Sequence, residues 1–102
     1  MDRTALLAEL LSQDPNNVLA RYGLAMEYSN NGDFDHALEE FAKLLAANPE
    51  YTAGYFMAAQ TLAKAARNEE ARKMLAEGIA TAERTGDSHA MSEMQGMLDQ
   101  LG

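Results

Sequence analysis

The residues best placed for metal chemistry are a histidine and two glutamates on one predicted helix. His36 stands three residues before Glu39 and four before Glu40, a spacing that puts the three side chains on one side of a helix. A metal site needs further ligands, and the only other histidine, His89, falls on a distant predicted helix. We therefore expect His36 to be a solvated surface residue, and we predict no metal site.

Paired acids could support acid–base catalysis, and the chain has two such pairs, Glu39-Glu40 and Glu69-Glu70. Adjacent residues of a helix point apart, however, and acids in early helical turns favour the helix dipole. The sequence has no cysteine, no glycine-rich phosphate loop and no nucleophile elbow. Its serines have no convincing His-Asp companion. We predict that the protein is not an enzyme and needs no cofactor.

Composition narrows the classes of partner. Sixteen acidic residues against eight basic ones give 102 residues a net charge of −8, and the basic residues are scattered from Arg3 to Arg84 with no dense block. Such a surface repels phosphate backbones, so we predict no nucleic-acid partner. No apolar run is long enough for a membrane span, so we predict no membrane partner. The N-terminus lacks the pattern of a secretory signal, and a cytoplasmic location is the expectation.

The elements that must position any site are helical nearly throughout. The sequence predicts helices over about 4–13, 17–30, 34–47, 51–65, 69–84 and 89–101. We expect Asp33 and Asn68 to cap the third and fifth of these helices. Gly32 suits a left-handed position after a helix end, whereas Ala66 at the matching place predicts a turn of different shape. No segment alternates in the manner of a strand, so the predicted class is all-α.

The helices also repeat. LLSQDPNNVLARYGLA at 10–25 is echoed 34 residues later by LLAANPEYTAGYFMAA at 44–59, so that Pro15 matches Pro49 and Tyr22 matches Phe56. A fixed period of this size indicates helical pairs that stack on their neighbours.

Small and large residues recur at set places within this period. They are Leu24, Ala25, Tyr28, Ala37, Phe41 and Pro49 in the first copy, and Tyr55, Ala58, Ala59, Leu62, Ala71, Leu75 and Gly78 in the second. In this pattern the chain resembles the tetratricopeptide repeat family. The resemblance implies a right-handed α-α superhelix that forms a single domain over 1–102, with six helices in the order B-AB-AB-A. It places a B-type helix at 1–14, repeats at 18–51 and 52–85, and a capping helix at 86–102.

The resemblance also implies a concave wall made by the A helices. Its floor would be apolar and aromatic, formed by Leu19, Tyr22, Met26 and Phe56, and its edge would carry Asn30, Gln60 and Lys64. The family positions that face this wall also include Ser29. Some family members clamp the terminal carboxylate of chaperone tails with groove Lys, Arg and Asn, but Tyr22 and Met26 stand at the first two of those places. The last helix could instead cover the floor, and Phe56 would then belong to the core.

Two functions follow from these surfaces. The first is an adaptor or scaffold that holds a peptide or helix of a protein partner in the groove. The alternative is a structural module that forms a homodimer through exposed apolar helix faces. The first helix favours this alternative because its wide leucine stripe, Leu6, Leu7, Leu10 and Leu11, has no A helix before it.

Overall fold

A computed structural model describes residues 2–102 of the chain, and these residues form six α-helices and no strand. The helices are α1 (Arg3–Gln13), α2 (Val18–Asn30), α3 (Phe34–Ala47), α4 (Thr52–Lys64), α5 (Asn68–Thr85) and α6 (Ser88–Leu101). The all-α prediction is confirmed. The predicted N-terminal element at 1–14 includes residue 1, which lies outside the described residues.

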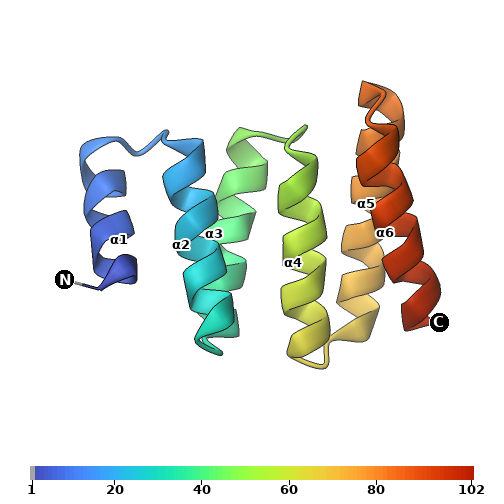
Figure 1. The fold of residues 1–102 in the computed structure, drawn as a ribbon, viewed down its shortest axis with the longest axis horizontal. Helices are drawn as coiled ribbons and strands as arrows, with labels where there is room; N and C mark the ends of the chain where they lie inside the picture. The colour runs from blue at the N-terminus through green and yellow to red at the C-terminus, as the bar shows by residue number, and fades with distance from the viewer. Residues whose placement is uncertain (1) are drawn as a thin grey trace.

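Successive helices run antiparallel and stack side by side along the long axis of the molecule, whose extents are 40 × 29 × 18 Å. In Figure 1, α3 lies behind α2 and α5 lies behind α6, so that α2, α4 and α6 form the front layer. Each helix packs mainly on its neighbours in sequence, as expected for a repeat protein. Among residues 2–102, no helix is both long and apolar enough to cross a membrane.

Polar side chains set the starts of four helices. Asp2, Asn17, Asp33 and Asp87 each accept a hydrogen bond from the backbone N–H three residues later, which satisfies one of the free donors of the first turn. The prediction for Asn68 is wrong, because Asn68 is the first residue of α5 and Arg67 occupies the cap position without a side-chain bond. Arg67 stands where Asp33 stands one repeat earlier, so the period itself locates this cap.

Three turns close in the same way. In each turn, a backbone N–H donates a hydrogen bond to the carbonyl five residues earlier. The pairs of donor and acceptor residues are Asp33 and Tyr28, Arg67 and Leu62, and Asp87 and Ala82. The residue before each of these donors has a positive φ, which is 81° at Gly32, 76° at Gly86 and 61° at Ala66. The prediction of a different turn at Ala66 is therefore wrong. The hydrogen-bond pattern and the packing of α4 on α5 hold an alanine in a conformation that normally favours glycine.

The core consists of three clusters that follow the repeats. The first contains Ala25, Ala37, Phe41, Leu44 and Ala58; the second contains Tyr55, Ala59, Leu75, Ala82 and Met94; the third contains Leu11, Ala20 and Leu24. The alanines of the first two clusters have no exposed surface. They let helix backbones approach closely while larger neighbours fill the remaining volume, as predicted from the repeat pattern.

The last helix departs from the period of 34. Its inward residues Met91, Met94 and Leu98 follow Tyr55, Ala58 and Leu62 of α4 by 36 residues, and they pack on the second cluster. The extra two residues arise because α5 has 18 residues where α3 has 14, while the connection to α6 is two residues instead of four. This shift decides which residues α6 presents beside α4.

Candidate functional site

The front layer has two seams, and the one between α2 and α4 is closed. The ring of Tyr22 meets Phe41 edge-on at a centroid distance of 6.4 Å and meets Tyr51 at 5.5 Å. This packing leaves Tyr22 half-buried. Burial raises the pKa of its hydroxyl above the usual range, and the neighbouring Tyr51 adds to the rise.

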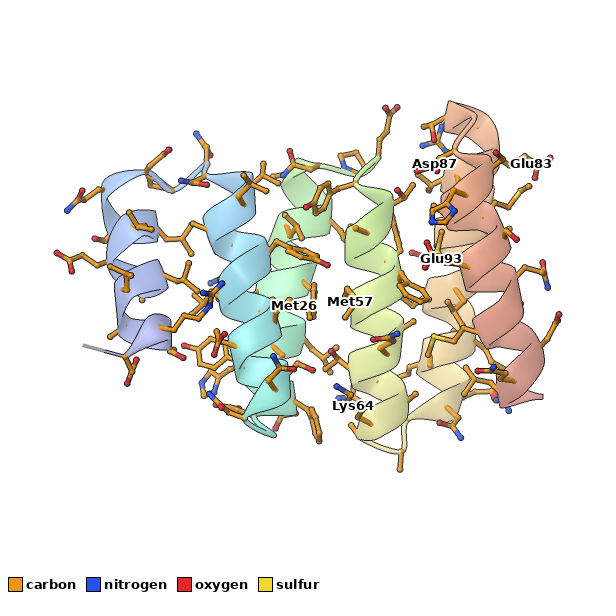
Figure 2. All side chains as sticks on the ribbon, in the orientation of Figure 1. Met26, Met57, Lys64, Glu83, Asp87 and Glu93 are labelled. Carbon is orange, nitrogen blue, oxygen red and sulfur yellow. The ribbon has the colours of Figure 1, made fainter. Side chains whose placement is uncertain are left out.

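Two methionines and a buried hydrogen bond complete this closed seam. Met26 of α2 and Met57 of α4 both pack against the first cluster, and Figure 2 shows them at neighbouring points between the two helices. Deeper in the seam, the hydroxyls of Ser29 and Thr61 are hydrogen-bonded at 2.9 Å, and both residues are buried. Ser29 therefore does not face the groove, although the repeat position predicts that it would.

The seam between α4 and α6 is open. Two hollows of about 210 and 370 Å³ lie along it, and both are lined by Phe56. Together we call them the α4–α6 trough. The first hollow is lined by Thr52, Ala53, Phe56, Asp87, His89, Ala90 and Glu93. The second is lined by Phe56, Gln60, Ser92, Glu93, Gly96, Met97 and Gln100.

Phe56 is the aromatic residue of the trough. It packs on one side against the second cluster and keeps part of its surface exposed. The last helix therefore lies beside Phe56 and does not bury it.

Small residues on α6 keep the trough open. With the shift of 36 residues, Ser92 matches Phe56 of α4, and Gly96 matches Gln60. A Cβ atom added to Gly96 would meet no atom within 4 Å. Ser92 and Gly96 thus have much smaller side chains than their α4 counterparts, Phe56 and Gln60. They leave the space between the two helices unfilled.

Acidic groups border the first hollow. The Asp87 carboxylate accepts hydrogen bonds from the Ala90 N–H at 3.1 Å and the Thr52 hydroxyl at 2.9 Å, and these bonds lower the pKa of Asp87. Glu93 lies 2.9 Å from Nε2 of His89, one turn earlier on α6. Among the described residues that line the two hollows, none is a lysine or an arginine.

The structure divides the seven residues predicted for the groove into two groups. Phe56 and Gln60 line the trough, and Lys64 is exposed at the last turn of α4. Lys64 does not line the trough, and neither do the four predicted residues of α2, which are Leu19, Tyr22, Met26 and Asn30. Leu19 is 75% exposed in the first turn of α2, and Asn30 is exposed in the last turn.

Sequence reasoning missed the contribution of α6. His89, Ser92, Glu93 and Gly96 line the trough, but the expected period of 34 does not predict their side of the helix. The spacing of the apolar residues Met91, Met94 and Leu98 indicates the buried side of α6 and predicts that Ser92 and Glu93 face water, but it does not predict that they stand beside α4.

The residues considered for metal binding, His36, Glu39 and Glu40, do not line the trough. His36 is exposed, as predicted; its Nδ1 atom lies 2.7 Å from a carboxylate oxygen of Asp33, and its ring lies against Tyr28 at a centroid distance of 5.3 Å. The contact with Asp33 raises the pKa of His36. No three potential metal-binding His, Asp or Glu side chains gather anywhere in residues 2–102.

Comparisons with known proteins agree with this architecture. Two family models described as tetratricopeptide repeat match the chain, at residues 29–92 and 6–39. A TPR repeat-containing protein of Pseudomonas aeruginosa is 32% identical over 95 residues, which cover 93% of this chain and 90% of the relative.

Solved structures give the same result. A protein of Bordetella parapertussis matches with a TM-score of 0.86 and 29% identity, covering 99% of this chain and 88% of its own. A tetratricopeptide repeat domain protein of Salinibacter ruber matches with a TM-score of 0.80 and 27% identity, covering 86% of this chain and 89% of its own.

Proposed function

Because this chain belongs to the tetratricopeptide repeat family, whose fold is a protein–protein interaction module, we propose that it is a non-catalytic adaptor that binds a peptide of a partner protein in the α4–α6 trough. In the proposed division of the chain, 18–51 and 52–85 are the full repeats, and 86–102 both caps the stack and forms one wall of the trough.

One observation carries the proposal: Phe56 is half-buried and lines both hollows of the trough. An aromatic side chain that is held by the core on one side and exposed on the other is already ordered before a partner arrives. Its contact area with a partner therefore costs little conformational entropy. Aromatic anchors of this kind dominate the energetics of many interfaces.

The size of the trough favours peptide side chains over a small molecule. Pockets for small ligands have volumes of about 300–1,000 Å³ and enclose most of the ligand. The first hollow, at about 210 Å³, falls below that range; the second, at about 370 Å³, lies near its lower limit and is more open to solvent, so it encloses a ligand poorly. Two adjoining hollows along a helix seam match an extended segment or a helix that presents successive side chains.

Two variants of one glycine test the proposal without disturbing the core. Because a Cβ at Gly96 meets no atom, Gly96→Ala should leave the trough open and stabilise α6 by up to about 1 kcal/mol. Gly96→Trp keeps the same backbone but places an indole in the second hollow. Peptides selected from a random display library on the unmodified protein are the probe, and their affinities are measured by fluorescence anisotropy.

We expect Gly96→Ala to bind these peptides normally and Gly96→Trp to lose them while melting at a similar temperature. Phe56→Ala should weaken binding at least about tenfold, which is about 1.4 kcal/mol. Because Phe56 is half-buried, this variant should lose about 2 kcal/mol of folding stability, less than the roughly 3–5 kcal/mol of a fully buried Phe. If binding survives in Phe56→Ala and Gly96→Trp alike, the trough is not the site.

A second candidate function, homodimer formation, rests on the other end of the molecule. Leu6 and Leu10 lie one turn apart on α1 and are 51% and 42% exposed. Exposed large apolar residues on successive turns of one helix favour a protein contact. Light scattering across a range of concentrations distinguishes the candidates: a dimer that Leu6→Glu dissociates supports this function, and a monomer at all concentrations contradicts it.

A further inference from the structure

If the trough binds a peptide, as the proposed function states, the charges of its lining point to the chemistry of that partner. We propose that the α4–α6 trough binds a segment in which an apolar side chain is flanked by lysine or arginine, with the apolar side chain against Phe56 and the basic group beside Asp87 and Glu93.

The lining of the first hollow supports the apolar part. Ala53, Phe56 and Ala90 supply its hydrocarbon surface, and its volume of about 210 Å³ matches a single side chain better than a whole ligand. Burying an aliphatic or aromatic side chain there removes apolar surface from water on both partners.

The rim of the same hollow supports the basic part. Asp87 and Glu93 are the acidic residues of its lining, and Figure 2 shows both on the side of α6 that faces α4, with Glu93 below Asp87, the cap residue of the helix. Both retain carboxylate lone pairs for a cation. Asp87 accepts two hydrogen bonds, from the Ala90 N–H and the Thr52 hydroxyl, out of the roughly four that a carboxylate can accept. Among residues 2–102, the Glu93 carboxylate pairs only with His89. Fixed negative charge beside an apolar hollow favours a partner with the opposite charge and disfavours an acidic one.

The charges elsewhere in the protein also favour a basic partner. The net charge of −8 attracts a basic segment at long range. The only cationic group of α4, Lys64, lies in its last turn, at the opposite end of the helix from Thr52 of the first hollow. Figure 2 shows Lys64 well separated from Asp87 and Glu93. The basic residue of the partner is therefore expected at the Asp87 end.

The test uses the display-selected peptides and three charge variants. Glu93→Lys reverses a charge in the trough, and Asp87→Asn removes one while keeping a side chain that caps α6. Glu77→Lys makes the same change of net charge on α5, where the residue is exposed and lines neither hollow. Each peptide is also synthesised with its basic residue replaced by Gln.

We expect selected peptides to be enriched in Lys or Arg next to an apolar residue. Glu93→Lys should weaken the binding of these peptides about fivefold or more, and Glu77→Lys should weaken it by less than about twofold. The Gln peptides should bind the unmodified protein more weakly and should be insensitive to Glu93→Lys. Raising the salt concentration should reduce the difference between the Lys and Gln peptides.

Two results overturn the inference, and they differ in what they say about the proposed function. Peptides that Gly96→Trp excludes but that lack basic residues, or that bind Glu93→Lys as well as the unmodified protein, contradict the charge assignment and leave the trough as a binding site. Peptides that bind both Phe56→Ala and Gly96→Trp as well as the unmodified protein contradict the proposed function, and the inference fails with it.

Discussion

The two seams of the front layer are built from the same kind of helix, yet one is filled and the other is open. Between α2 and α4, the Tyr22 ring, Met26 and Met57 pack against the first cluster, and the Ser29–Thr61 hydrogen bond joins the helices at depth. Between α4 and α6, Phe56 faces Ser92 and Gly96, and hollows remain. A repeat fold thus supplies similar seams, and a few side chains decide which of them keeps space between its helices.

The largest effect should come from the core that supports the open seam. Leu75 has no exposed surface and belongs to the second cluster. Leu75→Asp places a carboxylate where it finds neither water nor a partner, so we expect a loss of more than about 4 kcal/mol and of the cooperative thermal transition. The measurement is the melting curve by far-ultraviolet circular dichroism.

The matched control is the same substitution at an exposed leucine. Leu19→Asp alters a side chain that is 75% exposed, so it should change stability by less than about 0.5 kcal/mol. A Leu75→Asp protein that melts like the control would remove Leu75 from the core.

An intermediate effect should come from the packing behind the open seam, where α5 meets α4 and α6. A Cβ atom at Gly78 would lie 2.7 Å from Cβ of Tyr55 and even closer to Sδ of Met94, the residue that docks α6 on the core. Gly78→Ala should therefore cost about 1–3 kcal/mol and should displace α6 from α5. Chemical denaturation measures the cost, and amide hydrogen exchange should show faster exchange in α6 than in α2.

Gly23→Ala is the control at the contact between α1 and α2. A Cβ at Gly23 meets only the methyl groups of Leu7, at 3.4 Å, which is an ordinary contact. This variant should be neutral or more stable by up to about 1 kcal/mol. Equal losses of folding stability in Gly78→Ala and Gly23→Ala would show that the space around each glycine does not determine the cost of the added methyl group.

Much of the fold could be predicted from the sequence because the repeat imposes it. The Pro15–Pro49 and Ala25–Ala59 matches fix helix ends and close contacts that recur every 34 residues, and each repeat packs mainly on its neighbours. Phe56 could be placed beside α6 for the same reason. Whether α6 covers it could not be predicted, since that depends on an α5 longer than α3 and on the resulting shift of two residues.

The errors have a physical cause in common. Propensity indicates that an asparagine caps a helix and that a glycine makes a left-handed turn, and these rules failed at Asn68 and Ala66. At both places the packing of the pair α4 and α5 determines the backbone, and it overrides the local preference. Ser29 was likewise assigned to the groove by its position in the repeat, although its hydrogen bond with Thr61 holds it in the seam.

A smaller effect should separate global stability from the openness of the trough. Ala66 adopts φ 61° in the turn before α5, a conformation that costs a non-glycine residue roughly 1–2 kcal/mol. Ala66→Gly should therefore stabilise the protein by about 0.5–1 kcal/mol after the entropy of glycine in the unfolded chain is counted. Thermal melting measures the gain.

Peptide affinity should not change in Ala66→Gly, because the turn lies outside both seams. The same substitution at another exposed alanine, Ala46 within α3, should destabilise by about 1 kcal/mol and provides the control. A loss of stability at Ala66 as well would contradict the strained turn.

The smallest effect should appear at the rim of the trough and should depend on pH. The folded state lowers the pKa of Asp87 through the Ala90 N–H and then the Thr52 hydroxyl. The ionised Asp87 carboxylate therefore stabilises the folded protein at pH values above its pKa in the unfolded chain, near 3.8. This contribution is lost as the pH falls through the lower pKa that Asp87 has in the folded protein. Asp87→Asn should therefore melt slightly below the unmodified protein at pH 7.

The difference between the two proteins should shrink as the pH falls below 3.8 and should disappear once the Asp87 carboxylate of the folded protein is protonated, because both proteins then carry a neutral side chain at this position. Differential scanning calorimetry at several pH values measures it. A difference that persists undiminished in acid would mean that the ionised carboxylate is not the group that stabilises the start of α6.

The central claim is that partners enter the α4–α6 seam and not the α2–α4 seam, and the methionine methyl groups report on both. The chain has seven methionines; Met97 lines the second hollow, whereas Met26 packs in the closed seam. Nuclear magnetic resonance of methyl-labelled methionine during titration with a display-selected peptide therefore compares the seams in one sample. We predict a large shift of the Met97 methyl resonance and little change at Met26. A shift of Met26 with Met97 unchanged would contradict this assignment of the site.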